Sequence, residues 1–193
     1  MQKLHKIGLV CCLVVSPILN AMPALAAIVV NTKAVQPGFV DLDETYDIGM
    51  TMDDFNIRFG VPDRIWRSDS PKGSLNYGLE EWSYFGNGIQ VQGDQTDGQI
   101  KNFYFFIKPS KSSEFKRADV TFDFNLKSML SYSNLLKRLG KPRSNQVVAR
   151  ERFIRYDRGH YYLYFSFDQT GHLATVGLED KAYRDSRAEL PVW

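Results

Sequence analysis

The sequence predicts an α+β fold of two tandem units, each a short helical segment packed on a three- or four-stranded antiparallel sheet. Three observations indicate this fold: a helix-and-turn pattern occurs twice, strand-like segments follow each copy, and a Ser- and Lys-rich segment separates the copies. A helix on one face of a small antiparallel sheet is typical of the α+β class. The expected boundaries are a signal peptide at 1–26, a first unit at 27–108, a linker at 109–118, and a second unit with a C-terminal tail at 119–193.

The first 26 residues have the features of a secretory signal. Two lysines precede an apolar run too short to span a bilayer, and small residues at Ala24 and Ala26 suit a cleavage site. We therefore expect cleavage near Ala26 and a periplasmic or secreted protein. An uncleaved anchor and a lipoprotein stay open, although Cys11 and Cys12 lie too early in the apolar run for lipidation. Cleavage would leave no cysteine, so we expect neither disulfides nor thiol chemistry.

The two predicted helices align on Gly60 and Gly140. Nine positions before each glycine lies a hydroxyl residue, Thr51 or Ser131, which suits a helix N-cap. Large apolar residues lie five and one positions before each glycine and therefore share one helix face. A proline two residues after each glycine prevents further helix. We expect two helices of about two turns, each dependent on packing against a sheet.

Strand-like segments follow each helix in the same order. Tight Gly- and Asn-containing turns separate them, and the same apolar spacing follows Gly98 and Gly171. The segment 64–79, rich in Ser, Gly and Pro, is expected to be a loop, whereas 120–126 alternates and predicts a further strand. The tail from Asp180 is expected to be loosely docked or helical. The other expected strands are 80–85, 89–91, 152–156 and 161–167, with a last one after each of the two glycines.

The Gly49-Met50-Thr51 helix start, the closing Gly60-x-Pro62 and the later Trp82-x-Tyr84 strand resemble the outer-membrane-assembly lipoproteins of the SmpA/OmlA type. Two such units in tandem resemble the β-lactamase inhibitor protein (BLIP-like) architecture, in which paired units form one concave surface. The resemblance covers most of 47–179 and implies this fold and the binding of another protein. The sequence departs from the lipoproteins by its two units, and from the tandem inhibitors because residues 27–193 contain no cysteine.

The sequence offers no recognisable catalytic or metal site. After residue 26 the histidines are His160 and His172, expected at opposite ends of a strand pair. No glycine-rich phosphate loop, nucleophile motif or metal-ligand spacing occurs. A helix N-terminus explains the acids at 53–54, and strand alternation separates those at 80–81. We therefore expect a protein that is not an enzyme, with no catalytic residue, cofactor or metal.

Outward-facing aromatic residues on the strands form the candidate binding surface. Strand alternation places them opposite the core face, and tyrosine and arginine are typical of protein interfaces. Trp82 aligns with a core position and is therefore expected to be buried. The alternative is that another part of the chain covers this aromatic face. The expected binding residues are Tyr104, Phe106, Phe153, Arg155, Tyr162 and Tyr164.

The formal charge of +2 conceals a division between the two units. Residues 27–108 carry 7 basic and 12 acidic side chains, a net −5, whereas 109–193 carry 15 and 10, a net +5. Three interpretations stay open: mutual attraction of the units, a complementary protein partner, and contact with anionic lipid or cell-wall polymer. No nucleic acid partner is expected, because the basic residues flank no recognition motif.

Together these observations predict an exported protein-binding protein of the inhibitor or adaptor type. Its expected partner is another envelope or secreted protein, met on the aromatic sheet surface. Contact of the basic unit with a membrane stays open, whereas the apolar run is too short to span one. The alternatives are an outer-membrane or envelope assembly accessory, a binder of small molecules or glycans, and an unrecognised hydrolase.

Overall fold

The computed structural model describes residues 28–33, 37–42, 44–74 and 76–188. Within these ranges the chain forms three α-helices, a 3₁₀ helix and two sheets, one of four strands and one of eight. The predicted α+β class is confirmed. The predicted signal peptide at 1–26 lies outside the described residues. None of the described helices is both long and apolar enough to cross a membrane.

The larger sheet is antiparallel throughout, in the order β4-β5-β6-β7-β12-β11-β10-β9. The sequence predicts sheets of three or four strands, but pairing of β7 with β12 joins four strands from each half of the chain. The strands are β4 (Arg64–Arg67), β5 (Leu79–Tyr84), β6 (Ile89–Asp94), β7 (Gln99–Phe106), β9 (Ser144–Val148), β10 (Glu151–Asp157), β11 (Tyr161–Phe167) and β12 (Leu173–Asp180).

Two strands of this sheet were not predicted. The segment 64–79 was expected to be a loop but begins with β4, and β9 had no sequence signal. Both are edge strands whose side chains are mostly exposed, including Trp66 at 44% and Val147 at 57%. They have no buried face and therefore show no alternation of apolar and polar residues.

The smaller sheet has the order β3-β2-β1-β8, with β1 and β8 parallel and the other pairs antiparallel. Of the strand predicted at 120–126, only Val120–Phe122 forms a strand, and it pairs with the start of the described chain. Four-residue strands carry too short a pattern for the sequence to reveal the other three. The strands are β1 (Ile28–Asn31), β2 (Gly38–Asp41), β3 (Glu44–Asp47) and β8 (Val120–Phe122).

Helices α1 (Met52–Phe59) and α2 (Tyr132–Leu139) confirm the two predicted helices. The Thr51 hydroxyl accepts a hydrogen bond from the Asp54 amide at 3.1 Å, and Ser131 accepts the equivalent bond at 3.4 Å. When the two predicted units are aligned on their helix-ending glycines, a tyrosine at the same place in each unit also makes the same contact. The hydroxyls of Tyr84 and Tyr156 donate to the carbonyls of Gly60 and Gly140 at 3.1 and 2.9 Å. The short helix η1 (Leu126–Met129) precedes α2.

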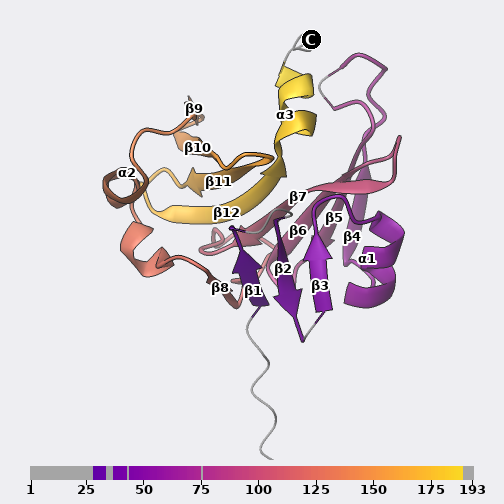
Figure 1. Ribbon diagram of the computed structural model, residues 1–193, viewed down its shortest axis with the longest axis horizontal. Coiled ribbons are helices and arrows are strands. Elements are labelled where there is room, and N and C mark those ends of the chain that lie inside the picture. The colour runs from indigo at the N-terminus through magenta and orange to yellow at the C-terminus, as the bar shows by residue number, and fades with distance from the viewer. Residues whose placement is uncertain (1–27, 34–36, 43, 75, 189–193) are drawn as a thin grey trace, which may run out of the picture.

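The core lies between the two sheets. Figure 1 shows the smaller sheet in front of the larger one, with α1 and α2 at opposite ends. The ring of Phe39 on β2 lies 5.2 Å from that of Phe103 and 6.3 Å from that of Phe55. At the other end Tyr132 on α2 packs edge-on against Phe167. Trp82 is 5% exposed, in agreement with its predicted core position.

The opposite face of the larger sheet, called the outer face below, is covered at two places. The segment 109–118, predicted to be a linker, brings the ring of Phe115 onto that of Phe106 at 3.9 Å. Helix α3 (Lys181–Ala188) confirms the helical alternative for the tail, and its Asp185 accepts a hydrogen bond from the Tyr162 hydroxyl. These two segments divide the outer face into covered and open regions.

Candidate functional site

All six predicted binding residues lie on the outer face. In the strand register Tyr104 pairs with Gly177, Gly177 with Tyr164, and Tyr164 with Arg155. Phe106 and Phe153 occupy the neighbouring row, separated by two small polar residues of β12 and β11. The structure therefore brings together residues that lie up to 60 positions apart in the sequence.

A buried carboxylate that the sequence analysis missed organises this surface. Glu179 on β12 is 1% exposed and accepts hydrogen bonds from Arg155, Nε to Oε2 at 2.5 Å and Nη2 to Oε1 at 3.1 Å. It also accepts the hydroxyl of Tyr104 at 2.9 Å. The charge-assisted bonds compensate for the removal of the carboxylate from water. The available signal was an acid at an outward position of a strand otherwise rich in apolar residues.

Burial and the charge of Glu179 together shift the pKa values of the groups around it. Burial, reinforced by the charge of Glu179, raises the pKa of Tyr104 well above its usual value. The same two causes raise the pKa of Tyr164. Burial disfavours the charged form of Arg155, but the charge and hydrogen bonds of Glu179 outweigh it and raise its pKa. Both phenols therefore stay neutral and the guanidinium stays charged near pH 7.

The rings around the ion pair hold one another in place. Tyr164 lies edge-on to Tyr104 at 5.4 Å and stacks with Phe153 at 6.4 Å. The guanidinium of Arg155 lies 5.2 Å from the centre of the Tyr164 ring. These four side chains are partly buried, and the side chain of Arg155 is 12% exposed. We call them the aromatic patch.

The other two predicted binding residues contact the chain itself. Tyr162 is 3% exposed beneath α3, where its hydroxyl donates to Asp185 at 2.8 Å. Phe106 is half-buried beneath Phe115. At these two positions another part of the chain covers the aromatic face, which is the alternative expected from the sequence. The open part of the predicted surface is the aromatic patch.

Open hollows flank the aromatic patch on the outer face. The linker hollow, of about 550 Å³, lies beside Phe106, Ser166 and Thr175. The α3 hollow, of about 290 Å³, is lined by β9, β10, β11 and α3 and contains three arginines. Its lining residues are Arg143, Ser144, Gln146, Arg155, Tyr162, Arg184 and Asp185.

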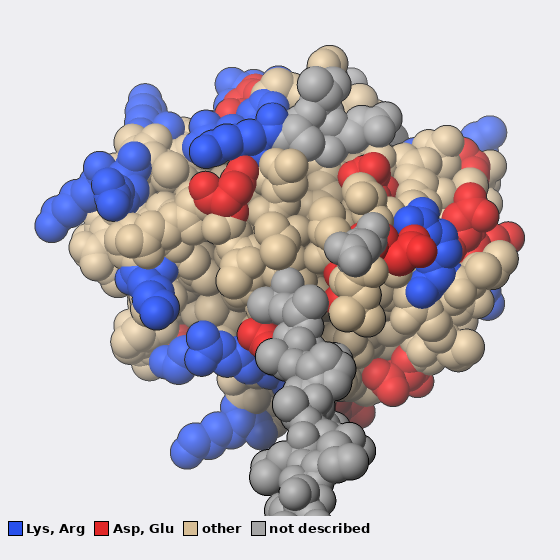
Figure 2. All heavy atoms as spheres, turned by 60° about the horizontal axis from the view of Figure 1, so that its bottom comes forward, with Lys and Arg blue, Asp and Glu red and all other residues tan. Residues whose placement is uncertain are grey.

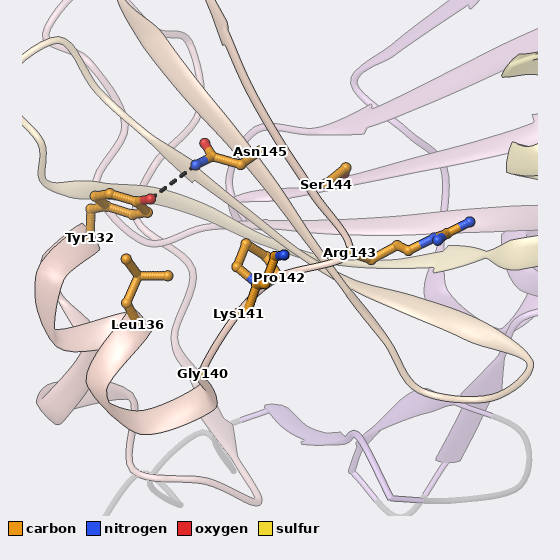
Figure 3. Close-up of a pocket in the computed structure, with 8 residues that line it drawn as sticks. All are labelled: Tyr132, Leu136, Gly140, Lys141, Pro142, Arg143, Ser144 and Asn145. Carbon is orange, nitrogen blue, oxygen red and sulfur yellow. Dashed lines mark hydrogen bonds between the residues drawn. The ribbon is translucent and has the colours of Figure 1, made fainter.

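A third hollow, the edge hollow of about 600 Å³, lies between α2 and β9 on the inner side of the sheet. Figure 3 shows Tyr132 and Leu136 facing β9, with Arg143 extending away from them. The Asn145 amide donates to the Tyr132 hydroxyl at 2.9 Å. The sequence analysis missed this hollow because β9 was not predicted.

The two histidines adjoin opposite ends of β11, as their sequence positions suggested. His172 Nδ1 lies 2.7 Å from the hydroxyl of Thr170, and His160 directly precedes the strand. Among the described residues no three His, Cys, Asp or Glu side chains are grouped to hold a metal ion.

No protein-family model and no curated protein matches this chain. A DUF4309 family protein (YjgB) from Bacillus subtilis matches with TM-score 0.45 and 21% identity, over 68% of this chain and 78% of that one. An extracellular protein containing a SCP domain from Bacillus anthracis matches with TM-score 0.44 and 14% identity, over 72% and 46%. A cysteine-rich secretory protein from Staphylococcus aureus matches with TM-score 0.40 and 13% identity, over 70% and 45%. The matched region covers less than half of the last two proteins, and at these scores we draw no functional conclusion.

Proposed function

We propose that this protein is an exported, non-enzymatic binding protein of the inhibitor or adaptor type whose aromatic patch contacts another envelope or secreted protein. The observation that carries the proposal is the partly exposed rings of Tyr164 and Phe153 beside the Arg155–Glu179 pair. Aromatic and arginine side chains dominate the binding energy of many interfaces. Rings already held by their neighbours lose little conformational entropy on binding.

The hollows favour a protein partner over a small molecule. Small ligands typically bind in concave sites that bury most of their surface. Here large side chains such as Phe39 and Phe103 fill the space between the sheets. The three hollows lie at the surface among exposed residues such as Lys108 and Lys141. A macromolecular surface can cover the aromatic patch and its flanking hollows together.

Export and the tandem organisation belong to the same proposal. The lysines, apolar run and small residues of 1–26 support export. The equivalent contacts of Tyr84 and Tyr156 support two tandem units of four strands each. The resemblance to the BLIP-like architecture stays part of this proposal and implies a continuous surface built from the paired units.

Capture of a partner from envelope extract tests the proposal. We expect the immobilised chain to retain a partner and the Phe153→Ala/Tyr164→Ala variant to retain at least about tenfold less. The matched control is Ile57→Ala/Val61→Ala, which removes two exposed apolar side chains at the α1 end. Equal recovery by the wild type and the patch variant would eliminate this surface.

The nature of the captured protein separates the two forms of the proposal. If it is an enzyme whose activity falls on binding, the protein is an inhibitor. If it is an assembly component with unchanged activity, the protein is an adaptor or assembly accessory. Thermal unfolding of each variant establishes that a loss of capture does not come from a loss of fold.

A further inference from the structure

Strand β9 ends the larger sheet and pairs with β10 on one side, with no strand of the described residues on its other side. An unpaired edge presents backbone groups with which an extended chain can pair. Proteins usually protect such an edge with charged residues or proline. The opposite edge, β4, has arginine at both ends, whereas β9 contains neither a charged residue nor proline. Val147 and Val148 on β9 are 57% and 59% exposed.

A hollow adjoins each face of β9. Alternation and register place Ser144 and Gln146 on the outer face and Asn145 on the inner face. Gln146 lines the α3 hollow, Asn145 lines the edge hollow, and Ser144 lines both. A strand added beside β9 would direct alternate side chains toward the two hollows.

The two hollows differ in chemistry. The edge hollow presents the apolar parts of Tyr132 and Leu136 (Figure 3). The α3 hollow contains Arg143 and Arg184, and neither forms an ion pair with an acid in the described part of the chain. Arg155 in the same hollow is already paired with Glu179. Asp185 lines the same hollow and offsets one of these two charges, so the outer side of the edge keeps a net positive charge.

The surrounding surface has the same sign. Figure 2 shows Lys and Arg gathered at the end of the molecule that carries α2, and most Asp and Glu at the α1 end. Long-range attraction therefore favours an acidic ligand at the β9 end.

We infer that β9 is a docking edge for an extended acidic segment of a partner protein, which adds a ninth strand to the sheet. Acidic side chains of this segment alternate with apolar ones, so that the acids reach Arg143 and Arg184 and the apolar residues reach Tyr132 and Leu136. The inference rests on the proposed function in taking a protein as the partner, but it uses the edge of β9, which adjoins the aromatic patch at Arg155.

Synthetic peptides test the pattern directly. The probe is a fluorescent peptide of about ten residues in which Glu and Val alternate, which is long enough to cover β9. Its control has the same composition in Glu-Glu-Val-Val order, which places both residue types on both faces. In fluorescence anisotropy titrations we expect the alternating peptide to bind at least about tenfold more tightly. Equal binding of the two peptides would overturn the inference.

Variants and hydrogen exchange test the site. Arg143→Glu/Arg184→Glu should weaken binding of the alternating peptide at least about tenfold. The matched control, Lys116→Glu/Lys127→Glu, makes the same charge change at exposed lysines that line neither hollow. Peptide binding should also slow amide exchange in Ser144–Val148, because added backbone hydrogen bonds protect edge amides. Unchanged exchange in β9, or dimerisation of the free chain through this edge, would refute it.

The outcomes distinguish this inference from the proposed function. If neither peptide binds but the patch variant still loses the envelope partner, the docking edge alone is wrong. If the alternating peptide binds and protects β9 but the patch variant captures the partner normally, the aromatic patch alone is wrong.

Discussion

At the residue scale, the buried carboxylate of Glu179 holds two side chains of the outer face in place, those of Tyr104 and Arg155. Its carboxylate is 1% exposed and depends on Arg155, which is itself held by the Tyr164 ring. A buried charge that loses its partner retains its desolvation cost without the compensating attraction. The stability of the sheet and the geometry of the aromatic patch therefore depend on the same ion pair.

The first prediction removes this partner. Arg155→Ala should lower the free energy of unfolding by about 3–5 kcal/mol, because it leaves the charge of Glu179 buried and unpaired. Replacing both residues, as in Arg155→Met/Glu179→Leu, should restore most of that loss. Urea unfolding of the variants measures both effects.

The control for this prediction is an exposed ion pair. Arg64 bonds to Glu114 at 2.9 Å, and both side chains are more than half exposed. Arg64→Ala should cost about 0–1 kcal/mol, because water screens the pair. If Arg155→Ala is no more destabilising than Arg64→Ala, the buried pair does not have the role assigned to it.

At the element scale, α1 and α2 have the same local features. Each has eight residues, a hydroxyl N-cap, a completely buried side chain (Phe55 or Leu135) and a glycine at its C-terminus. Helices of this length are marginal alone, so attachment to the sheet determines their stability. Tyr84 and Tyr156 provide this attachment by donating to the carbonyls of the terminal glycines.

The second prediction concerns these tyrosine hydroxyls. Tyr84→Phe and Tyr156→Phe should each lower the free energy of unfolding by about 0.5–1.5 kcal/mol, since each removes one hydrogen bond and keeps the ring. Chemical denaturation measures both variants. Tyr46→Phe is the control, because its ring is buried but its hydroxyl has no partner among the hydrogen bonds of the described residues. A loss at only one of the two positions would show that the helices are not equivalent.

At the scale of the whole molecule, α3 connects the two halves of the larger sheet. It follows β12 in the second half, and its Arg187 donates to Asp94 on β6 at 3.1 Å. Two further ion pairs of the described residues join the halves, Arg64 with Glu114 and Lys108 with Asp168. These contacts agree with mutual attraction of the halves, although Figure 2 shows that their charges are still largely separated.

The third prediction follows from the titration of Asp94. Burial alone would raise its pKa, but hydrogen bonds from Thr96 and Arg187 outweigh burial and lower it below 3.8. A carboxyl with a depressed folded-state pKa stabilises the fold above its unfolded-state pKa, and this contribution is lost as the pH falls through the folded-state value. Asp94→Asn should therefore be less stable than the wild type at pH of about 7 and match it at pH of about 2.

Urea unfolding at both pH values checks this expectation. Asp69→Asn provides the control, because Asp69 is exposed in the loop after β4. This change should stay within about 0.5 kcal/mol of the wild type at both pH values. A stability difference for Asp94→Asn that persists undiminished at low pH would contradict the ionic origin of the contact.

The sequence alone is enough to predict the α+β class, both capped helices, and the strands that bury an alternating apolar face. These features depend on interactions within a few residues, such as the Thr51 cap and the one-sided core pattern of Tyr161–Phe167. The sequence also determined which face of the larger sheet is rich in tyrosine and arginine, because strand periodicity depends on spacing alone.

The accessibility of these residues depends instead on how the whole chain packs. The joining of β7 to β12, the pairing of Glu179 with Arg155, and the covering of Tyr162 by α3 bring together distant segments. Strand β9 and its hollows could likewise not be predicted from the sequence, because an exposed edge strand needs no alternating pattern. Local spacing determines which way a side chain points, whereas packing of the whole chain determines what covers it.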